Sequence, residues 1–180
     1  MGKLATALFL LVAASPAGAQ PLANVAGIGI PNFGKVNDNY YRGAQPKTAD
    51  YSKLAQLGIR TVIDLTKNGE ALEASAVARE GMRFVRIPLT TSDRPSAEAV
   101  DRFLGLVNDP ANQPVYVHCQ GGRHRTGLMT ALFRLTHDGW TAEKAFDEMR
   151  RYEFDKGFVS HGTLKNFLFD FYKRAVANES

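Results

Sequence analysis

The sequence contains very little cysteine: Cys119 is the single one among 180 residues. One thiol cannot form a disulfide within the chain, so a disulfide-stabilised scaffold is excluded. An unpaired cysteine is either a small buried core residue or a reactive thiol. The choice between these two roles depends on the residues that flank Cys119.

Long apolar runs are also missing. The apolar run at residues 4–14 has about 11 residues, whereas a membrane-spanning helix needs about 20. Lys3 precedes this run, and the small residues of Ser15–Ala19 follow it with the spacing of an A-x-A cleavage site. This order is typical of a secretory signal peptide, although a retained anchor or a core helix is the alternative. We therefore predict a signal peptide over residues 1–19 and export to the periplasm or the medium, with no membrane span in the mature chain.

The charge balance is weak, with a formal net charge of +4 from 22 basic and 18 acidic residues. Such a protein tolerates anionic substrates, but this balance gives no argument for nucleic-acid binding. The four histidines do not have the spacing of metal ligands. We therefore expect no nucleic-acid partner, no metal and no cofactor, and we expect a monomer.

The order of predicted elements indicates the fold class. Residues 20–35 are rich in Gly, Pro, Ala and Asn, and we expect a flexible lead-in there. Segments that are β-branched or alternate in polarity predict strands over residues 36–42, 59–65, 82–88 and 115–118. Helical spacing of apolar residues predicts helices over residues 48–57, 69–81, 96–107, 126–137, 141–152 and 161–176. Strands that alternate with helices predict one α/β domain over residues 36–176, with a mostly parallel sheet of four to five strands flanked by helices.

The most informative segment is VYVHCQGGRHRTG at residues 115–127, in which a strand leads through a loop into a helix. This arrangement directs backbone N–H groups and the positive end of the helix dipole at one point. Gly121 and Gly122 permit tight curvature without side chains in the way. We call residues 119–125 the anion loop, because the pattern predicts a cradle for an oxyanion.

The side chains of the anion loop suggest a chemistry. Arg125 follows Cys119 after five residues, and its planar guanidinium can hold two oxygens of a tetrahedral anion. A helix N-terminus and a nearby cation lower the pKa of a cysteine, so we predict that Cys119 is a nucleophile that forms a phosphocysteine. The Thr126 hydroxyl is placed to stabilise the sulfur as a leaving group. We expect His118 to hold the backbone of the loop by hydrogen bonds. The predicted phosphate-binding residues are Gln120, Gly121, Gly122, Arg123, His124 and Arg125.

The pattern H-C-x5-R-[ST]-G resembles the protein tyrosine and dual-specificity phosphatase superfamily. Further segments are similar to the plant and fungal atypical dual-specificity phosphatases: Asn32-Phe33 with Val36, Tyr40–Gly43 with Pro46, Asn112–Pro114, Asp147-Glu148 and Arg150–Tyr152. The resemblance implies activity on phosphotyrosine-type substrates or inositol pyrophosphates. It also implies that Arg123 and His124 project toward a polyanion. The substrate that we expect is a phosphorylated protein or an inositol phosphate.

A leaving alkoxide needs a proton, so we expect a general acid. Members of the superfamily carry this acid on the loop after the strand that corresponds to residues 82–88. Asp93 lies in that loop and is the predicted acid, with a solvated loop aspartate as the alternative.

Two other functions stay open. A rhodanese-like sulfurtransferase also uses a cysteine loop, but its loop does not require Arg-Thr-Gly after five intervening residues. A phosphate-binding module without catalysis normally loses the nucleophile or the arginine, and this chain keeps both.

Overall fold

The computed structural model describes residues 28–156 and 162–179. The predicted signal peptide at residues 1–19 lies outside these residues. The strands are β1 (Gly34–Asn37), β2 (Tyr40–Ala44), β3 (Thr61–Thr66), β4 (Arg83–Leu89) and β5 (Val115–Cys119). The α-helices are α1 (Tyr51–Gln56), α2 (Glu73–Arg79), α3 (Ala97–Asn108), α4 (His124–His137), α5 (Ala142–Arg151) and α6 (Gly162–Glu179). A short 3-10 helix, η1 (Thr48–Asp50), precedes α1.

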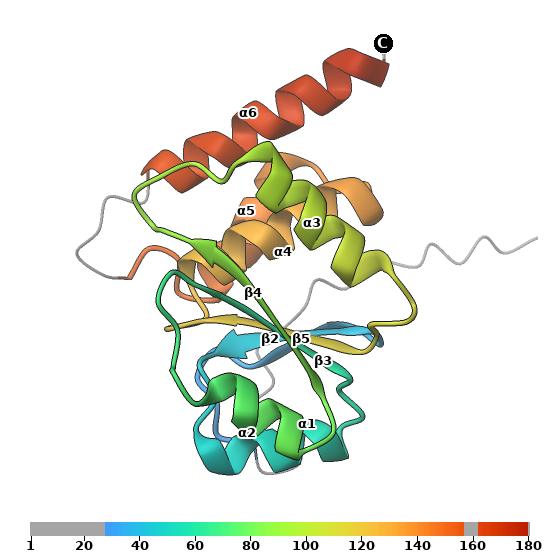
Figure 1. The fold of residues 1–180 in the computed structure, drawn as a ribbon. Coiled ribbons are helices and arrows are strands. Elements are labelled where there is room, and N and C mark those ends of the chain that lie inside the picture. The colour runs from blue at the N-terminus through green and yellow to red at the C-terminus, as the bar shows by residue number, and fades with distance from the viewer. Residues whose placement is uncertain (1–27, 157–161, 180) are drawn as a thin grey trace, which may run out of the picture.

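The strands form one five-stranded sheet in the order β1-β2-β5-β3-β4. β5 is parallel to both of its neighbours, β3 is parallel to β4, and β1 is antiparallel to β2. Helices cover both faces of the sheet (Figure 1). The predicted α/β class with a mostly parallel sheet is therefore confirmed. The carboxyl ends of β2 and β5 meet where Ala44 pairs with Cys119, at the edge where ligands bind in open α/β sheets.

The central strand β5 contributes side chains to two separate cores. Val115, Val117 and Cys119 belong to a large core with residues of α3, α4, α5 and α6. Tyr116 belongs to a smaller core with residues of α1 and α2, and these two helices lie on the opposite side of the sheet (Figure 1). Alternate residues of a strand point to opposite faces, so neighbours along β5 have different surroundings.

The N-terminal part of the domain differs from prediction in two ways. The single strand expected at residues 36–42 is a hairpin of β1 and β2, because Asn37 Oδ1 accepts the N–H of Asn39 at 2.9 Å and closes a turn. The flexible lead-in expected at residues 20–35 is wrong for the part that the structure describes. Ile28, Ile30 and Phe33 are buried in the smaller core, and their apolar burial fixes a segment whose glycine and proline content suggested disorder.

The helix boundaries follow local capping. The Ser96 hydroxyl accepts the N–H of Ala99 at 3.1 Å and begins α3, as predicted. The Thr141 hydroxyl caps α5 in the same way. Helix α4 begins at His124, two residues before the predicted start at residue 126, so its first two residues belong to the anion loop. Among the described residues, no helix is both long and apolar enough to cross a bilayer.

Candidate active site

The anion loop connects the end of β5 to the start of α4. Gly122 has φ of +67°, and a Cβ at this position would lie 2.5 Å from the carbonyl carbon of Gly43. Only glycine combines this backbone conformation with so close an approach. Gly121 is less restricted, because the nearest atom to a Cβ there would be 3.7 Å away. The predicted need for glycine therefore applies strictly to one of the two positions.

Cys119 is 2% exposed and is the last residue of β5. Burial by itself raises the pKa of its thiol, but the charge of Arg125 and hydrogen bonds from Thr126 and Gly122 outweigh burial and lower the pKa below its ordinary value. The buried Thr126 hydroxyl has no partner among the described residues other than this sulfur. The loop therefore favours a thiolate, which is the form that acts as a nucleophile.

Arg125 extends from the first turn of α4 toward β4. Its Nη1 donates to the carbonyl oxygen of Leu89 at 3.3 Å. With Gln120 and the loop after β3, it lines a hollow of about 300 Å³. Lys67 also lines this hollow and adds a second cation to it. The hollow thus places two cations and the carboxylate of Glu70 next to the anion loop.

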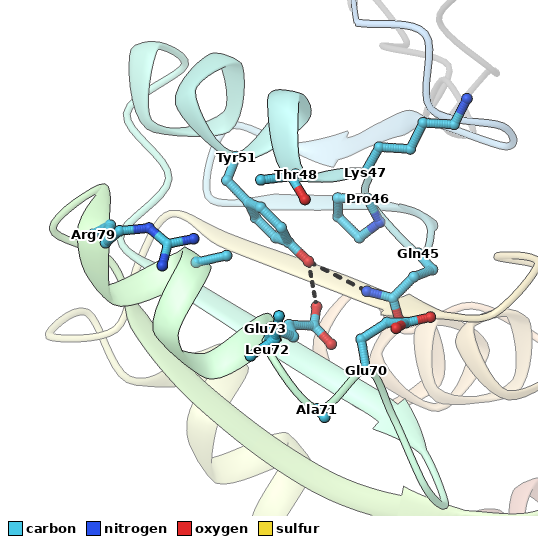
Figure 2. Close-up of a pocket in the computed structure, with 11 residues that line it drawn as sticks. Gln45, Pro46, Lys47, Thr48, Tyr51, Glu70, Ala71, Leu72, Glu73 and Arg79 are labelled. Carbon is cyan, nitrogen blue, oxygen red and sulfur yellow. Dashed lines mark hydrogen bonds between the residues drawn. The ribbon is translucent and has the colours of Figure 1, made fainter.

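A larger hollow of about 680 Å³ adjoins the first one between η1, α1 and α2. Gln45 and Glu70 border both hollows. Figure 2 shows the Tyr51 hydroxyl pointing to both Gln45 and Glu73, whereas Lys47 points away from them. The surface beside the anion loop therefore has room for more of a ligand than one phosphoryl group.

Asp93 lies in the loop after β4, as predicted, and it is exposed. Its Oδ2 accepts the Thr90 hydroxyl at 2.7 Å, and its N–H donates to the same hydroxyl oxygen at 3.0 Å. Asp93 lines a small hollow of about 250 Å³ that does not include Arg125. The loop itself starts beside Leu89, the residue that Arg125 contacts. The role of Asp93 as general acid stays a prediction.

His118 does not lie where it was expected, because it occupies the opposite face of β5 from Cys119. Its Nε2 is 2.9 Å from Glu73 Oε1, off the direction of a well-aligned hydrogen bond, and its Nδ1 is 4.0 Å from Asp64 Oδ1. Its ring stacks on Tyr116 with centroids 5.6 Å apart. The predicted hydrogen bonds from His118 to the backbone of the anion loop are therefore wrong. Strand alternation turns this side chain away from the loop.

The surroundings of His118 form a buried acidic cluster. Asp64, Glu73 and His118 each offer one ligand atom, and these atoms lie within 4.8 Å of one another. Protein donors already occupy much of this cluster. Asp64 accepts from Arg86 Nε at 2.7 Å and from Thr66, and Glu73 Oε1 accepts from the Tyr51 hydroxyl at 2.9 Å. We therefore interpret it as an internal polar network, and the expected absence of a metal stays a prediction.

The side chains of Arg123 and His124 also differ from what the resemblance implied. Arg123 Nε donates to Glu153 Oε2 at 3.0 Å. The Nε2 of His124 is 2.9 Å from the carbonyl oxygen of Phe154, and its ring contacts Phe154 edge-on. Both side chains are thus held against the turn after α5. These contacts oppose a position of the two side chains over a bound polyanion.

Three residues that contact the anion loop were missed as site residues: Asn32, Arg42 and Gln45. They donate to the carbonyl oxygens of Gly121, Gly122 and Gln120, respectively, at 2.9, 2.6 and 3.2 Å. Asn32 and Arg42 lie in the two N-terminal segments that resemble the atypical dual-specificity phosphatases, but the resemblance assigned them no role in the site. No sequence spacing connects these residues to a loop some 80 positions later.

Comparison with protein families supports this view of the site. Residues 27–166 match a family model described as "DSP-PTPase phosphatase fused to NAD+ Kinase". The match covers both the N-terminal hairpin and the anion loop.

Named relatives are similar over about two thirds of the chain. OCA1 of Mycosarcoma maydis, whose name classes it with the tyrosine-protein phosphatases, is 32% identical over 127 residues, which are 68% of this chain and 80% of OCA1. The dual specificity protein phosphatase TpbA of Pseudomonas aeruginosa is 28% identical over 120 residues, 67% of this chain and 54% of TpbA. The inositol diphosphatase SIW14 of Saccharomyces cerevisiae is 28% identical over 131 residues, 69% of this chain and 46% of SIW14. The matched segment is thus about half the length of the last two proteins.

Solved structures show the same fold. The crystal structure of TpbA superimposes with a TM-score of 0.70 at 26% identity, and it covers 91% of this chain and 99% of the TpbA chain. The catalytic core of Siw14 superimposes with a TM-score of 0.67 at 25% identity, over 83% of this chain and 94% of that chain. The geometry of the anion loop agrees with the family model and with these relatives. The chain therefore belongs to the DSP-PTPase family of cysteine-dependent phosphatases.

Proposed function

We propose that this protein is a metal-independent phosphatase that works through a phosphocysteine. One observation carries the proposal. Cys119 ends the central strand with its thiol pKa lowered by Arg125, Thr126 and Gly122. A buried thiol with no such surroundings would have a raised pKa and would be inert.

The first step transfers the phosphoryl group to sulfur. The Cys119 thiolate attacks phosphorus in line, an S–P bond forms, and the bond from phosphorus to the leaving oxygen breaks. Arg125 and the amides of the anion loop bind the three equatorial oxygens as charge shifts in the transition state. In this proposal Asp93 gives a proton to the leaving oxygen.

The second step releases phosphate. Water attacks phosphorus, the S–P bond breaks, and the electron pair returns to sulfur. The Thr126 hydroxyl has no other partner among the described residues, so it is available to stabilise this thiolate. The proton of the attacking water passes to a base, for which Asp93, deprotonated in the first step, is the candidate.

For the substrate, we propose a phosphorylated protein or an inositol phosphate. The relatives are named dual specificity protein phosphatase and inositol diphosphatase, and one structural neighbour is a cysteine variant of TpbA in complex with phosphotyrosine. Arg125 and Lys67 line the same hollow, and their positive charges suit an anion. The adjoining hollow of about 680 Å³ can accept the peptide of a phosphorylated protein or the rest of an inositol phosphate.

The direct test compares wild type with Cys119→Ser on p-nitrophenyl phosphate. We expect turnover by wild type and a loss on the order of 10⁵-fold in the variant, with a phosphoenzyme trapped by acid quench in wild type alone. Phosphate binding without turnover in both proteins would favour a binding module, and thiosulfate–cyanide turnover would favour a sulfurtransferase. A panel of phosphotyrosine peptide, phosphoserine peptide, phytate and inositol pyrophosphate then ranks the substrates.

We also propose that the protein is exported and monomeric. The charged start, apolar middle and small-residue end of residues 1–19 support export. Mass spectrometry of protein from the periplasm or the medium of an expressing bacterial cell should show a chain that starts at Gln20. Full-length protein in the cytoplasm would contradict export, and a dimer mass in light scattering would contradict the monomer.

A further inference from the structure

An anion loop can bind an oxyanion only if its peptide units face the right way. Amide N–H groups must point to the centre of the loop. The carbonyl of each such peptide unit then points outward into the protein, where it needs a hydrogen-bond donor. The donors that hold these carbonyls therefore decide whether the loop is preformed.

In this structure one short segment supplies these donors. The carbonyl of Gln120 accepts the backbone N–H of Gln45, the carbonyl of Gly121 accepts Asn32 Nδ2, and the carbonyl of Gly122 accepts Arg42 Nη2. All three donors come from residues 32–45, around the β1–β2 hairpin. Two of them are side chains and can be changed without changing the backbone.

Arg42 is an unusual donor because it is fully buried. Its Nη2 lies 2.6 Å from the Gly122 carbonyl oxygen, and its guanidinium stacks on the Tyr152 ring at 3.9 Å. Its Nε and Nη1 have no hydrogen-bond partner among the described residues. Burial lowers the pKa of Arg42. The negative charges of Tyr152, Glu148, Tyr40 and Cys119, in this order, act against that effect of burial.

Asn32 holds the loop from a strained backbone conformation. Its φ is +54°, and Glu153 is the other non-glycine residue in the described part of the chain with positive φ, at +63°. The two side chains meet, since Asn32 Nδ2 is also 3.4 Å from Glu153 Oε2, the oxygen that accepts from Arg123. Strained residues that gather at one point suggest a functional constraint there.

We propose that Asn32 and Arg42 are positioning residues, which keep the anion loop open for a phosphoryl group by holding the carbonyls of Gly121 and Gly122 outward. This inference rests on the proposed function, since it assigns residues to the same phosphoryl site. Neither residue contacts the reacting atoms. Both act through the orientation of the peptide units that do.

The test uses two conservative variants. Asn32→Gly keeps the left-handed backbone conformation and removes the amide. Arg42→Lys keeps a buried positive charge and removes the planar guanidinium. For each variant, three quantities are measured: kcat/KM on p-nitrophenyl phosphate, affinity for tungstate by calorimetry, and the thiol pKa from the pH dependence of iodoacetamide alkylation. Thermal unfolding is followed alongside.

We expect each variant to lose roughly tenfold in kcat/KM and in tungstate affinity, less than the loss of a direct oxyanion donor. We also expect the thiol pKa of Cys119 to rise, because inward N–H groups stabilise the thiolate. A lower unfolding temperature with unchanged tungstate affinity and thiol pKa would show a merely structural role and would overturn the proposal.

Matched controls exist on the same chain. Arg134 is also a buried arginine, stacks on Trp140 at 4.3 Å and donates to the Val36 carbonyl at 3.2 Å. Asn112 is a buried asparagine that donates to the Leu106 carbonyl at 3.1 Å. Arg134→Lys and Asn112→Gly should lower the unfolding temperature and leave thiol pKa and tungstate affinity unchanged. Similar losses in the controls would contradict a role specific to Asn32 and Arg42.

The design separates this proposal from the proposed function. Tungstate affinity and thiol pKa do not depend on turnover. If wild type hydrolyses no phosphate ester but binds tungstate, and both variants weaken that binding, the phosphatase proposal fails and the positioning role stands. If wild type is active and the variants match it in all three quantities, the positioning role alone fails.

Discussion

His118 and Cys119 are consecutive residues with opposite electrostatic surroundings. Cys119 faces Arg125 and a loop of amides, and its thiol pKa is lowered. His118 faces the carboxylates of Asp64 and Glu73 on the other side of the sheet. Two adjacent residues of β5 therefore face a cationic site on one side of the sheet and an acidic site on the other. The comparison suggests that the first side serves chemistry and the second side serves stability.

The largest expected effect is on the cationic side. Arg125→Lys should lower kcat/KM on p-nitrophenyl phosphate by about 10³-fold, because an ammonium cannot hold two equatorial oxygens as the guanidinium fork does. Circular dichroism and thermal unfolding provide the check on folding. If kcat/KM fell less than about threefold in a folded variant, a catalytic role of the cationic side would be contradicted.

The next effect tests the general acid. Asp93→Asn should slow hydrolysis of alkyl phosphate esters by about 10²-fold. It should slow pyrophosphate hydrolysis much less, because phosphate is already a good leaving group. Steady-state rates on phosphoserine peptide and on an inositol pyrophosphate measure this difference.

Glu70→Gln is the matched control, since Glu70 is an exposed acid that lines the hollow beside Arg125. It should leave both rates within about threefold of wild type. If Glu70→Gln rather than Asp93→Asn selectively slows the hydrolysis of esters, the general acid lies on the loop after β3.

A smaller effect concerns pH. Because Arg125 and Thr126 lower the thiol pKa of Cys119, the thiolate persists to lower pH than in free cysteine, which is about 0.3% ionised at pH 6. Alkylation by iodoacetamide should rise with pH, reach its plateau at a lower pH than in the denatured protein, and exceed that of the denatured protein at pH 6. If alkylation of folded and denatured protein depended on pH in the same way, the electrostatic difference between the two sides of β5 would be contradicted.

The smallest effect on activity is expected on the acidic side. Glu73→Gln weakens the contacts of Glu73 with Tyr51 and His118, and it should lower the free energy of unfolding by about 1–3 kcal/mol. The kcat should stay within about threefold of wild type when measured well below the unfolding temperature. Urea unfolding and steady-state kinetics measure the two quantities. A large loss of kcat without a loss of stability would show that the acidic cluster acts on the anion loop.

Local patterns predicted much of the molecule. The β-branched segments that became β3 and β5 and the Ser96 cap of α3 follow from side-chain type and spacing. The low thiol pKa of Cys119 follows from the order of strand, loop and helix. The hairpin of β1 and β2 and the burial of Ile28 were not foreseen. The hairpin follows from a local turn at Asn37, which the single-strand prediction overlooked. The burial of Ile28 depends on contacts with distant parts of the chain, which override the turn-forming composition of residues 20–35.

The sequence by itself determined the fold class and the anion loop with Cys119 and Arg125 at its two ends, because the loop is a local segment of fixed spacing between a strand and a helix. Only the tertiary structure decided what surrounds that loop. It turned His118 toward Glu73, tied Arg123 and His124 to the turn after α5, and brought Asn32 and Arg42 to the outer carbonyls. The physical reason is that strand alternation and sheet order set which face each side chain occupies, and these depend on pairing between segments far apart in the chain.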